Sequence, residues 1–162
     1  MANQIKVVAF DLGTTVGYAS KSDTIQSGIM KFEQDRFAGG GARYLAFKKW
    51  LVNYLLENKP EEVVFEKVHR HAGTAAAHVY GGLCAILMAE CERVEIPYHG
   101  YDVGPIKKSW TGKGNAKKPA MVAEAKRRGY EVADDNEADA LAMIHLWMEE
   151  NEPEVLELED ML

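Results

Sequence analysis

The expected order of strands and helices constrains this chain most, because three consecutive strands precede an alternation of helices and strands. The β-rich apolar segments lie at residues 5–10, 16–20, 24–32, 63–66 and 97–101. Apolar residues recur at helical spacing over residues 44–55, 74–93 and 135–149, and another helix ends at Arg128 after a loop at 112–115. Strands joined by tight turns pair antiparallel, whereas strands joined through a helix pair parallel. The sequence therefore predicts an α/β fold with a mixed five-stranded sheet and helices on both faces.

Length and composition fit one globular domain with a short extension at its C-terminal side. The chain has 162 residues, of which 47% are hydrophobic and 27% are charged, so collagen-like, low-complexity and wholly disordered chains are excluded. We expect one domain over residues 1–150, followed by a flexible acidic tail over residues 151–162. The apolar residues of this tail leave an alternative open, in which it binds a protein partner.

The cysteines and the hydropathy pattern indicate where the protein works. Cys84 and Cys91 lie on one face of an expected helix, without the CxxC spacing of metal or redox sites, and are typical of buried thiols in a reducing compartment. No apolar run approaches the roughly 20 residues needed to cross a bilayer, and the N-terminus lacks a signal-peptide pattern. We therefore expect a cytoplasmic protein without membrane association.

Three acidic residues occupy places where acidic residues are uncommon. Asp11 and Glu66 each end a buried strand, and parallel neighbouring strands would bring these two side chains to the same edge of the sheet. Asp139 shares the apolar face of the last long helix with residues that should pack on the sheet, and Asp135 and Asn136 lie one turn earlier on that face. Converging carboxylates repel one another unless a cation lies between them, and oxygen ligands favour Mg²⁺ or Mn²⁺.

Each of these acids also has a purely structural interpretation. Asp11 could cap a turn, Glu66 could pair with Lys67 or Arg70, and Asp135 or Asp139 could cap the start of the helix. All three interpretations together would require three acids to converge by accident. We therefore favour a divalent metal site, and two ions about 3.5–4 Å apart are a common device for phosphodiester hydrolysis.

A basic segment between Lys107 and Arg128 contrasts with the overall net charge of −6. Lys113, Lys117 and Lys118 lie at the expected start of a helix, where positive side chains oppose the helix dipole. A bound anion would reverse this unfavourable interaction, because backbone N–H groups and ammonium groups would then act together. We therefore interpret these lysines as contacts to DNA phosphates.

These patterns together resemble the RuvC family of Holliday junction resolvases, within the RNase H-like nuclease superfamily. The resemblance rests on Asp11-Leu-Gly-Thr-Thr-Val-Gly-Tyr-Ala19, on Val-Val-Phe-Glu66, on Asp135-Asn-Glu-Ala-Asp139-Ala-Leu-Ala142, and on Lys107 followed by Gly112-Lys-Gly-Asn-Ala-Lys-Lys118. It covers most of residues 5–148, and a short chain with an acidic tail is typical of phage-encoded members.

The resemblance implies a nuclease that binds two Mg²⁺ ions, with Mn²⁺ as a substitute, through Asp11, Glu66 and Asp139. Lys107 and Lys118 would reach the scissile region. The family usually has an Asp or His three residues before the final Asp, where this chain has Asn136. Either Asn136 or Asp135 would then supply the fourth ligand, or only three strong ligands remain. The implied reaction is resolution of four-way DNA junctions by paired symmetric nicks, carried out by a homodimer.

The loop after Glu66 contains His69 and Arg70, which the resemblance places near the crossover of the junction. His69 could stack on a base and Arg70 could contact a phosphate, or both could be plain surface residues. Gly81 and Gly82 weaken an expected helix by roughly 1 kcal/mol each, so another helix should approach closely there, in the core or across a twofold axis.

Three alternative functions remain at this point. A related enzyme could cut branched DNA more broadly or cut RNA–DNA hybrids, and a protein of the same fold could bind DNA without cleaving it. Asp11-Leu-Gly-Thr-Thr also resembles the phosphate loop of actin-like and hexokinase-like ATPases, but those proteins need two such domains, which 162 residues do not supply.

Overall fold

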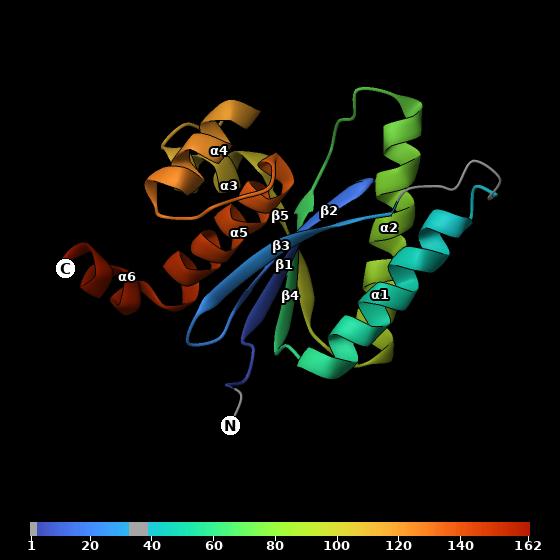
Figure 1. Cartoon of the computed structure of the whole chain (residues 1–162), viewed down its shortest axis with the longest axis horizontal. Coiled ribbons are helices and arrows are strands. Elements are labelled where there is room, and N and C mark those ends of the chain that lie inside the picture. Colours follow the sequence, from blue (N-terminus) through green and yellow to red (C-terminus); the bar gives the residue numbers. More distant parts are fainter. Residues whose placement is uncertain (1–2, 33–38) are drawn as a thin grey trace.

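A computed structural model describes residues 3–32 and 39–162 of the chain (Figure 1). The strands in this part are β1 (Val7–Asp11), β2 (Thr15–Lys21), β3 (Ile25–Lys31), β4 (Glu62–Lys67) and β5 (Tyr98–Asp102). The helices are α1 (Ala42–Asn58), α2 (Thr74–Arg93), α3 (Val103–Thr111), α4 (Lys118–Arg127), α5 (Asp135–Asn151) and α6 (Pro153–Asp160).

The strands form one sheet in the order β3-β2-β1-β4-β5. The two hairpins pair β1 with β2 and β2 with β3 antiparallel, whereas β1 pairs with β4 and β4 with β5 in parallel. The predicted mixed five-stranded sheet is thus confirmed. Because β1 is central and buried along its whole length, its last residue, Asp11, lies in the middle of one sheet edge.

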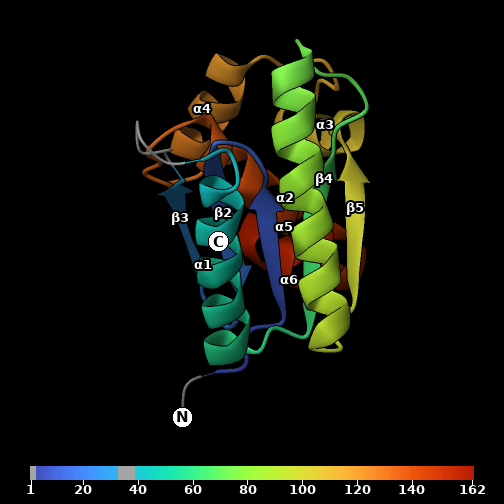
Figure 2. The same ribbon diagram turned by 90° about the vertical axis from the view of Figure 1, so that its right-hand side faces the viewer.

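Alternating side chains of β1 divide the interior into two layers. Val7 and Ala9 face α3, α4 and α5, whereas Val8 and Phe10 face α1 and α2. Figures 1 and 2 show these helices on opposite sides of the sheet. Since successive residues of a strand point to opposite faces, a continuous apolar run is what a strand covered on both sides requires.

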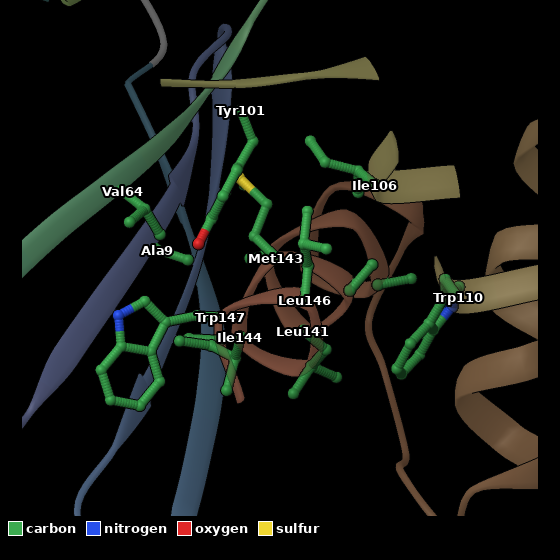
Figure 3. Close-up of a cluster of buried hydrophobic side chains, with 14 of the residues drawn as sticks. Ala9, Val64, Tyr101, Ile106, Trp110, Leu141, Met143, Ile144, Leu146 and Trp147 are labelled. Atoms are coloured by element: carbon green, nitrogen blue, oxygen red, sulfur yellow. The ribbon is translucent and has the colours of Figure 1, made fainter. Parts of the chain in front are cut away.

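On one side of the sheet the core is built around α5. Residues 140–148 of α5 are all buried, and Figure 3 shows several of them packed between the sheet and the side chains of Ile106 and Trp110. The indole nitrogen of Trp110 donates a hydrogen bond of 3.0 Å to the carbonyl of Met121, which ties α3 to α4. This packing fixes α5, and with it Asp139, against the sheet.

On the other face, α2 packs against α1 at one of its two glycines. A Cβ on Gly82 would lie 2.4 Å from the ring of Tyr44 in α1, whereas a Cβ on Gly81 would have open space. The close helix approach expected from the sequence is therefore present within the chain at Gly82. Cys91 is buried and Cys84 half-buried in the same layer, and both are free thiols.

The α2 helix bears on the expectation that no segment of this chain spans a membrane. Its 20 residues are long and apolar enough, by length and composition alone, to cross a membrane, with a mean hydropathy of 1.3 in the most apolar window. A core helix of a globular protein passes the same test, so this is weak evidence. Leu83, Leu87 and Cys91 of α2 are fully buried in the sheet layer.

Two helices were not anticipated from the sequence. Residues 103–111 form α3, which ends at Gly112 in a left-handed conformation. Residues 153–160 of the expected tail form α6, and Glu152 at its start forms ion pairs with Lys6 and Lys21. The division into a domain over residues 1–150 and a flexible tail stays a prediction. The tail does contain the helix α6, which begins directly after Glu152, the residue that pairs with Lys6 and Lys21.

Candidate active site

Three carboxylates from distant parts of the sequence meet at the carboxyl edge of the central strands. One ligand oxygen each from Asp11, Glu66 and Asp139 can be chosen so that all three lie within 4.8 Å of one another. Phe10 pairs with Phe65 in the parallel register of β1 and β4, which places Asp11 and Glu66 side by side at the ends of their strands. Asp139 comes from the second turn of α5, which lies across this edge.

The start of α5 is positioned by buried polar contacts. Asp134 is the N-cap residue, and its carboxylate accepts a hydrogen bond of 3.1 Å from the backbone N–H of Glu137. The buried carboxylate of Glu137 accepts hydrogen bonds of 2.7 Å from the Ser27 hydroxyl in β3 and 2.7 Å from the backbone N–H of Ala133. Helix capping, proposed for Asp135 or Asp139, is therefore performed by Asp134.

The end of β4 is held from α2. The hydroxyl of Tyr80 donates a hydrogen bond of 2.7 Å to the carbonyl of Glu66 and accepts one of 3.3 Å from the backbone N–H of Val68. Burial raises the pKa of the Tyr80 hydroxyl to about 12, so it remains a donor at neutral pH. No ion pair joins Glu66 to Lys67 or Arg70 in the part of the chain described, which removes the structural interpretation of Glu66.

Burial and mutual repulsion disfavour the charged forms of the three acids. Burial, followed by the charges of Glu66 and Asp139, raises the pKa of Asp11 well above its ordinary value. Burial is also the largest cause that raises the pKa of Glu66, and burial together with Glu66 and Asp135 raises the pKa of Asp139 to about 7. Lys107 acts in the opposite direction and lowers the pKa of both Glu66 and Asp139. The cluster therefore lacks positive charge in proportion to its carboxylates.

One buried oxygen of the cluster lacks a hydrogen-bond partner within the described chain. Oδ1 of Asp139 is buried and, within residues 3–32 and 39–162, has no hydrogen-bond partner. A buried polar atom without a partner is unfavourable and uncommon. The ligand atoms that Asp11, Glu66 and Asp139 offer are carboxylate oxygens, which hard divalent cations prefer over soft ligands. Asp11, Glu66 and Asp139 thus fit a site for such a cation.

The position of a fourth ligand remains open between the two residues predicted. The side-chain amide of Asn136 donates a hydrogen bond of 3.1 Å to the carboxylate of Asp134. The Asp135 carboxylate lies 3.6 Å from the ammonium of Lys118, and its charge raises the pKa of both Asp11 and Asp139. Asp135 is therefore electrostatically coupled to the cluster, although the group of oxygens within 4.8 Å comprises only Asp11, Glu66 and Asp139 among the described acids.

The predicted basic residues lie in α3, in the segment before α4 and at the start of α4. Lys107 lies in α3 near enough to influence Glu66 and Asp139, whereas Lys113 and Lys117 lie in the exposed segment before α4. Lys118 begins α4 with a side chain that is 82% exposed. Exposed ammonium groups of this kind are suited to contact a phosphate backbone.

His69 and Arg70 are both exposed in the loop that follows Glu66. The Nε2 atom of His69 lies 2.9 Å from the carboxylate of Asp102 at the end of β5, and His69 lowers the pKa of Asp102. Sequence reasoning missed this partner, as it missed Tyr80, Asp134 and Glu137. Asp102 directly follows the expected strand at residues 97–101, and this position at a strand end is the sequence signal that could have identified it.

Comparisons with known proteins agree with this architecture. No protein-family model and no curated protein matches the sequence. The structure resembles Thermus thermophilus RuvC with a TM-score of 0.66 and 17% identity over 86% of this chain and 91% of that chain. It also resembles T. thermophilus RuvC in complex with a Holliday junction substrate, with a TM-score of 0.68 and 19% identity over 86% and 90% of the two chains. A third similar structure is the yeast mitochondrial Holliday junction resolvase Ydc2, with a TM-score of 0.62 and 14% identity over 88% of this chain and 77% of that one.

The protein thus has an RNase H-like α/β fold, with a cluster of acids at the carboxyl edge of its central strands. Within that class, its sheet and helices have the RuvC-type arrangement found in Holliday junction resolvases, as the sequence predicted.

Proposed function

We propose that this protein is a divalent-metal-dependent endonuclease that resolves four-way DNA junctions. The observation that carries the proposal is the convergence of Asp11, Glu66 and Asp139 around a buried carboxylate oxygen that has no partner in the described chain. The RuvC-type fold supports the same conclusion, because the similar structures are resolvases and one of them holds a Holliday junction substrate.

In this proposal, Asp11, Glu66 and Asp139 hold two Mg²⁺ ions, for which Mn²⁺ substitutes, with Asp135 or Asn136 as a further ligand. When bound there, such ions would supply activation of a water molecule for in-line attack on a phosphodiester and stabilisation of the leaving 3′ oxygen, which would give a 5′-phosphate. Lys107 offsets the negative charge of Glu66 and Asp139. Its charge thereby favours the ionised, metal-binding form of these carboxylates.

The DNA is oriented by side chains around this centre. Lys113, Lys117 and Lys118 contact phosphates on one side, and Arg70 contacts a phosphate on the other. His69, held by Asp102, stacks on a base near the crossover. These contacts position the substrate without reading its sequence. Two such centres in a homodimer match the two symmetric nicks that resolve a four-way junction, and the free thiols are compatible with a cytoplasmic location.

A cleavage assay with several substrates tests the proposal. End-labelled four-way junction, replication fork, linear duplex and RNA–DNA hybrid are incubated with Mg²⁺, with Mn²⁺ and with EDTA. We expect paired nicks in the four-way junction only when a divalent ion is present. Asp139→Asn should abolish cleavage while junction binding persists, and the exposed Glu131→Gln should leave cleavage unchanged.

The outcomes separate the alternatives. Equal cleavage of forks or hybrids would show a broader nuclease. Junction binding without cleavage under either metal would show a DNA-binding protein of the same fold. This alternative is tested because Asn136 stands where the family usually has an Asp or His. Cleavage by Asp139→Asn at the wild-type rate would contradict the assignment of the site.

A further inference from the structure

The C-terminal helix α6 carries an apolar stripe that nothing in the described chain covers. Val155 and Leu158 in α6, followed by Met161 and Leu162, are exposed, with Leu158 at 64% and Met161 at 82%. The other exposed large hydrophobic side chains among the described residues are Leu45 and Leu56 of α1. Exposed apolar residues gathered on one short helix are typical of an interaction surface.

The helix that carries the stripe is attached to the rest of the chain by contacts of Glu152 and Leu156. Glu152, at the start of α6, pairs with Lys6 and with Lys21. Leu156, on the opposite side of the helix from Leu158, packs against the core around α5. Figure 1 shows α6 extending beyond α5 to the edge of the molecule, with the C-terminus at its far end. The exposed stripe therefore faces away from its own domain.

Acidic residues flank the stripe on this helix. Glu154, Glu157, Glu159 and Asp160 lie within or at the end of α6, and residues 149–162 contain no Lys or Arg. A surface that binds α6 therefore needs an apolar floor with a rim of positive charge.

The same chain has a surface of that description along α4. A hollow of about 630 Å³ is floored by small apolar residues and rimmed by cations. It is lined by Ala116 in the segment before α4, by Ala120 and Ala123 in α4, and by the cations Lys113, Lys117 and Arg127. Glu124 also borders the hollow, but its carboxylate is bonded to Arg127 and Arg128. Alanines let another helix approach closely, and the basic rim suits an acidic helix.

The apolar stripe of α6 and the alanines of the α4 hollow lie apart in one chain, although Arg127 of the rim also borders a second hollow together with Leu156, Glu159 and Asp160. No residue of α6 lines the α4 hollow among the residues described, and α6 is held with its stripe turned outward. We infer that the apolar stripe of α6 docks into the α4 hollow of a second copy of this chain. The contact joins different surfaces of the two copies, so a twofold dimer would contain it twice, with each α6 docked on its partner.

The inferred contact has a consequence that rests on the proposed function. Lys113 and Lys117 border the hollow and are also proposed to contact DNA phosphates. An acidic helix seated between them competes with DNA for the same ammonium groups. Junction DNA should therefore release α6, and α6 should weaken junction binding at low salt.

Site-specific photo-crosslinking in the full-length protein tests the contact without DNA or nuclease activity. Leu158→p-benzoylphenylalanine is prepared with ¹⁴N and with ¹⁵N, and the two preparations are mixed equally, irradiated and mapped by mass spectrometry. We expect mixed-isotope products that join residue 158 to residues 113–127. Ala120→Glu should remove them by placing an acid in the hollow. The same photoreactive residue at position 45, which is equally exposed in α1, should not label residues 113–127.

The results distinguish the possible occupants. Same-isotope products alone would show that α6 contacts its own chain, and the absence of products at residues 113–127 would show a different partner; either result overturns the inference. Leu158→Asp should raise junction affinity several-fold at low salt, whereas Leu45→Asp should not. Crosslinking without this change would overturn the competition with DNA. A wild-type protein that crosslinks but never binds junctions would instead contradict the proposed function.

Discussion

Gly17 of β2 lies directly against the backbone of Asn136 at the start of α5. A Cβ atom on Gly17 would come within 2.0 Å of the carbonyl oxygen of Asn136. Gly17 is also the register partner of Asp11 in the β1–β2 pair. One glycine therefore determines how closely the helix that carries Asp139 approaches the strand that carries Asp11.

Gly17→Ala should separate the two halves of the candidate metal site. The added methyl group meets backbone atoms rather than a flexible side chain, so α5 has to shift. We expect a loss of about 1–3 kcal/mol in the free energy of unfolding, measured by urea denaturation. We also expect at least tenfold weaker Mn²⁺ binding, measured by calorimetry. Gly104→Ala, where a Cβ has open space, should change neither quantity in this way.

The metal-free protein should lose part of its stability as pH rises, because of the acidic cluster. Well below pH 4, Asp139 is protonated in both the folded and the unfolded chain, because its ordinary pKa is 3.8. As pH rises from about 4 to about 7, the unfolded chain releases this proton while the folded chain retains it, since the folded pKa is about 7. A shift of this size, acting alone, destabilises the fold by on the order of 4 kcal/mol above pH 7.

The measurement is the melting temperature in EDTA from pH 4 to pH 8, compared between wild type and Asp139→Asn. The difference between the two proteins isolates the cluster, because burial lowers the pKa of His145 to about 4 and so makes stability rise over part of the same range. We expect Asp139→Asn to be the more stable protein at pH 8. Equal stability of the two proteins throughout this range would contradict the repulsion among the acids.

Lys107 should set the pH range in which the site binds metal. Its charge lowers the pKa of Glu66 and Asp139, so Lys107→Met should raise both and shift metal-dependent cleavage to higher pH. The expected result is a large loss of rate at pH 6.5 that is partly recovered at pH 8.5. The neighbouring Lys108→Met removes an exposed charge and should leave the pH profile unchanged. A uniform loss at every pH would assign Lys107 to DNA contact instead.

Lys118 should contribute one phosphate contact to junction binding. Its exposed ammonium lies 3.6 Å from Asp135 and is free to approach a phosphate. Lys118→Ala should lower junction affinity and reduce the slope of log K against log salt by about 1. Lys126→Ala, at the other end of α4, provides the control. An unchanged slope for Lys118→Ala would remove this residue from the interface.

The fold and the acid cluster were predictable because both follow from local patterns. Asp11 and Glu66 each end an apolar strand, and Asp139 lies on the apolar face of a helix. The residues next to each acid in the sequence therefore predict where its side chain lies. Tyr80 and Glu137 were not predictable in the same way. Their hydrogen bonds reach Glu66 and Ser27, which are distant in sequence, and only the packed structure brings these partners together.

The helices α3 and α6 were missed for different reasons. The segment of α3 contains Gly104 and Pro105, which normally indicate a loop, but Ile106 and Trp110 are buried against α5 and stabilise the helix. The segment of α6 is strongly acidic, as flexible tails often are. Its attachment depends on Lys6 and Lys21 at the other end of the chain.

Diffraction from crystals soaked in Mn²⁺, with anomalous scattering recorded, tests the central claim most directly. The claim is that the carboxylates of Asp11, Glu66 and Asp139 together bind divalent cations. We predict anomalous peaks within ligand distance of all three carboxylates, including Oδ1 of Asp139, and no such peaks in Asp139→Asn crystals. Wild-type crystals without manganese at this edge of the sheet, under saturating Mn²⁺ at pH 8, would contradict the account.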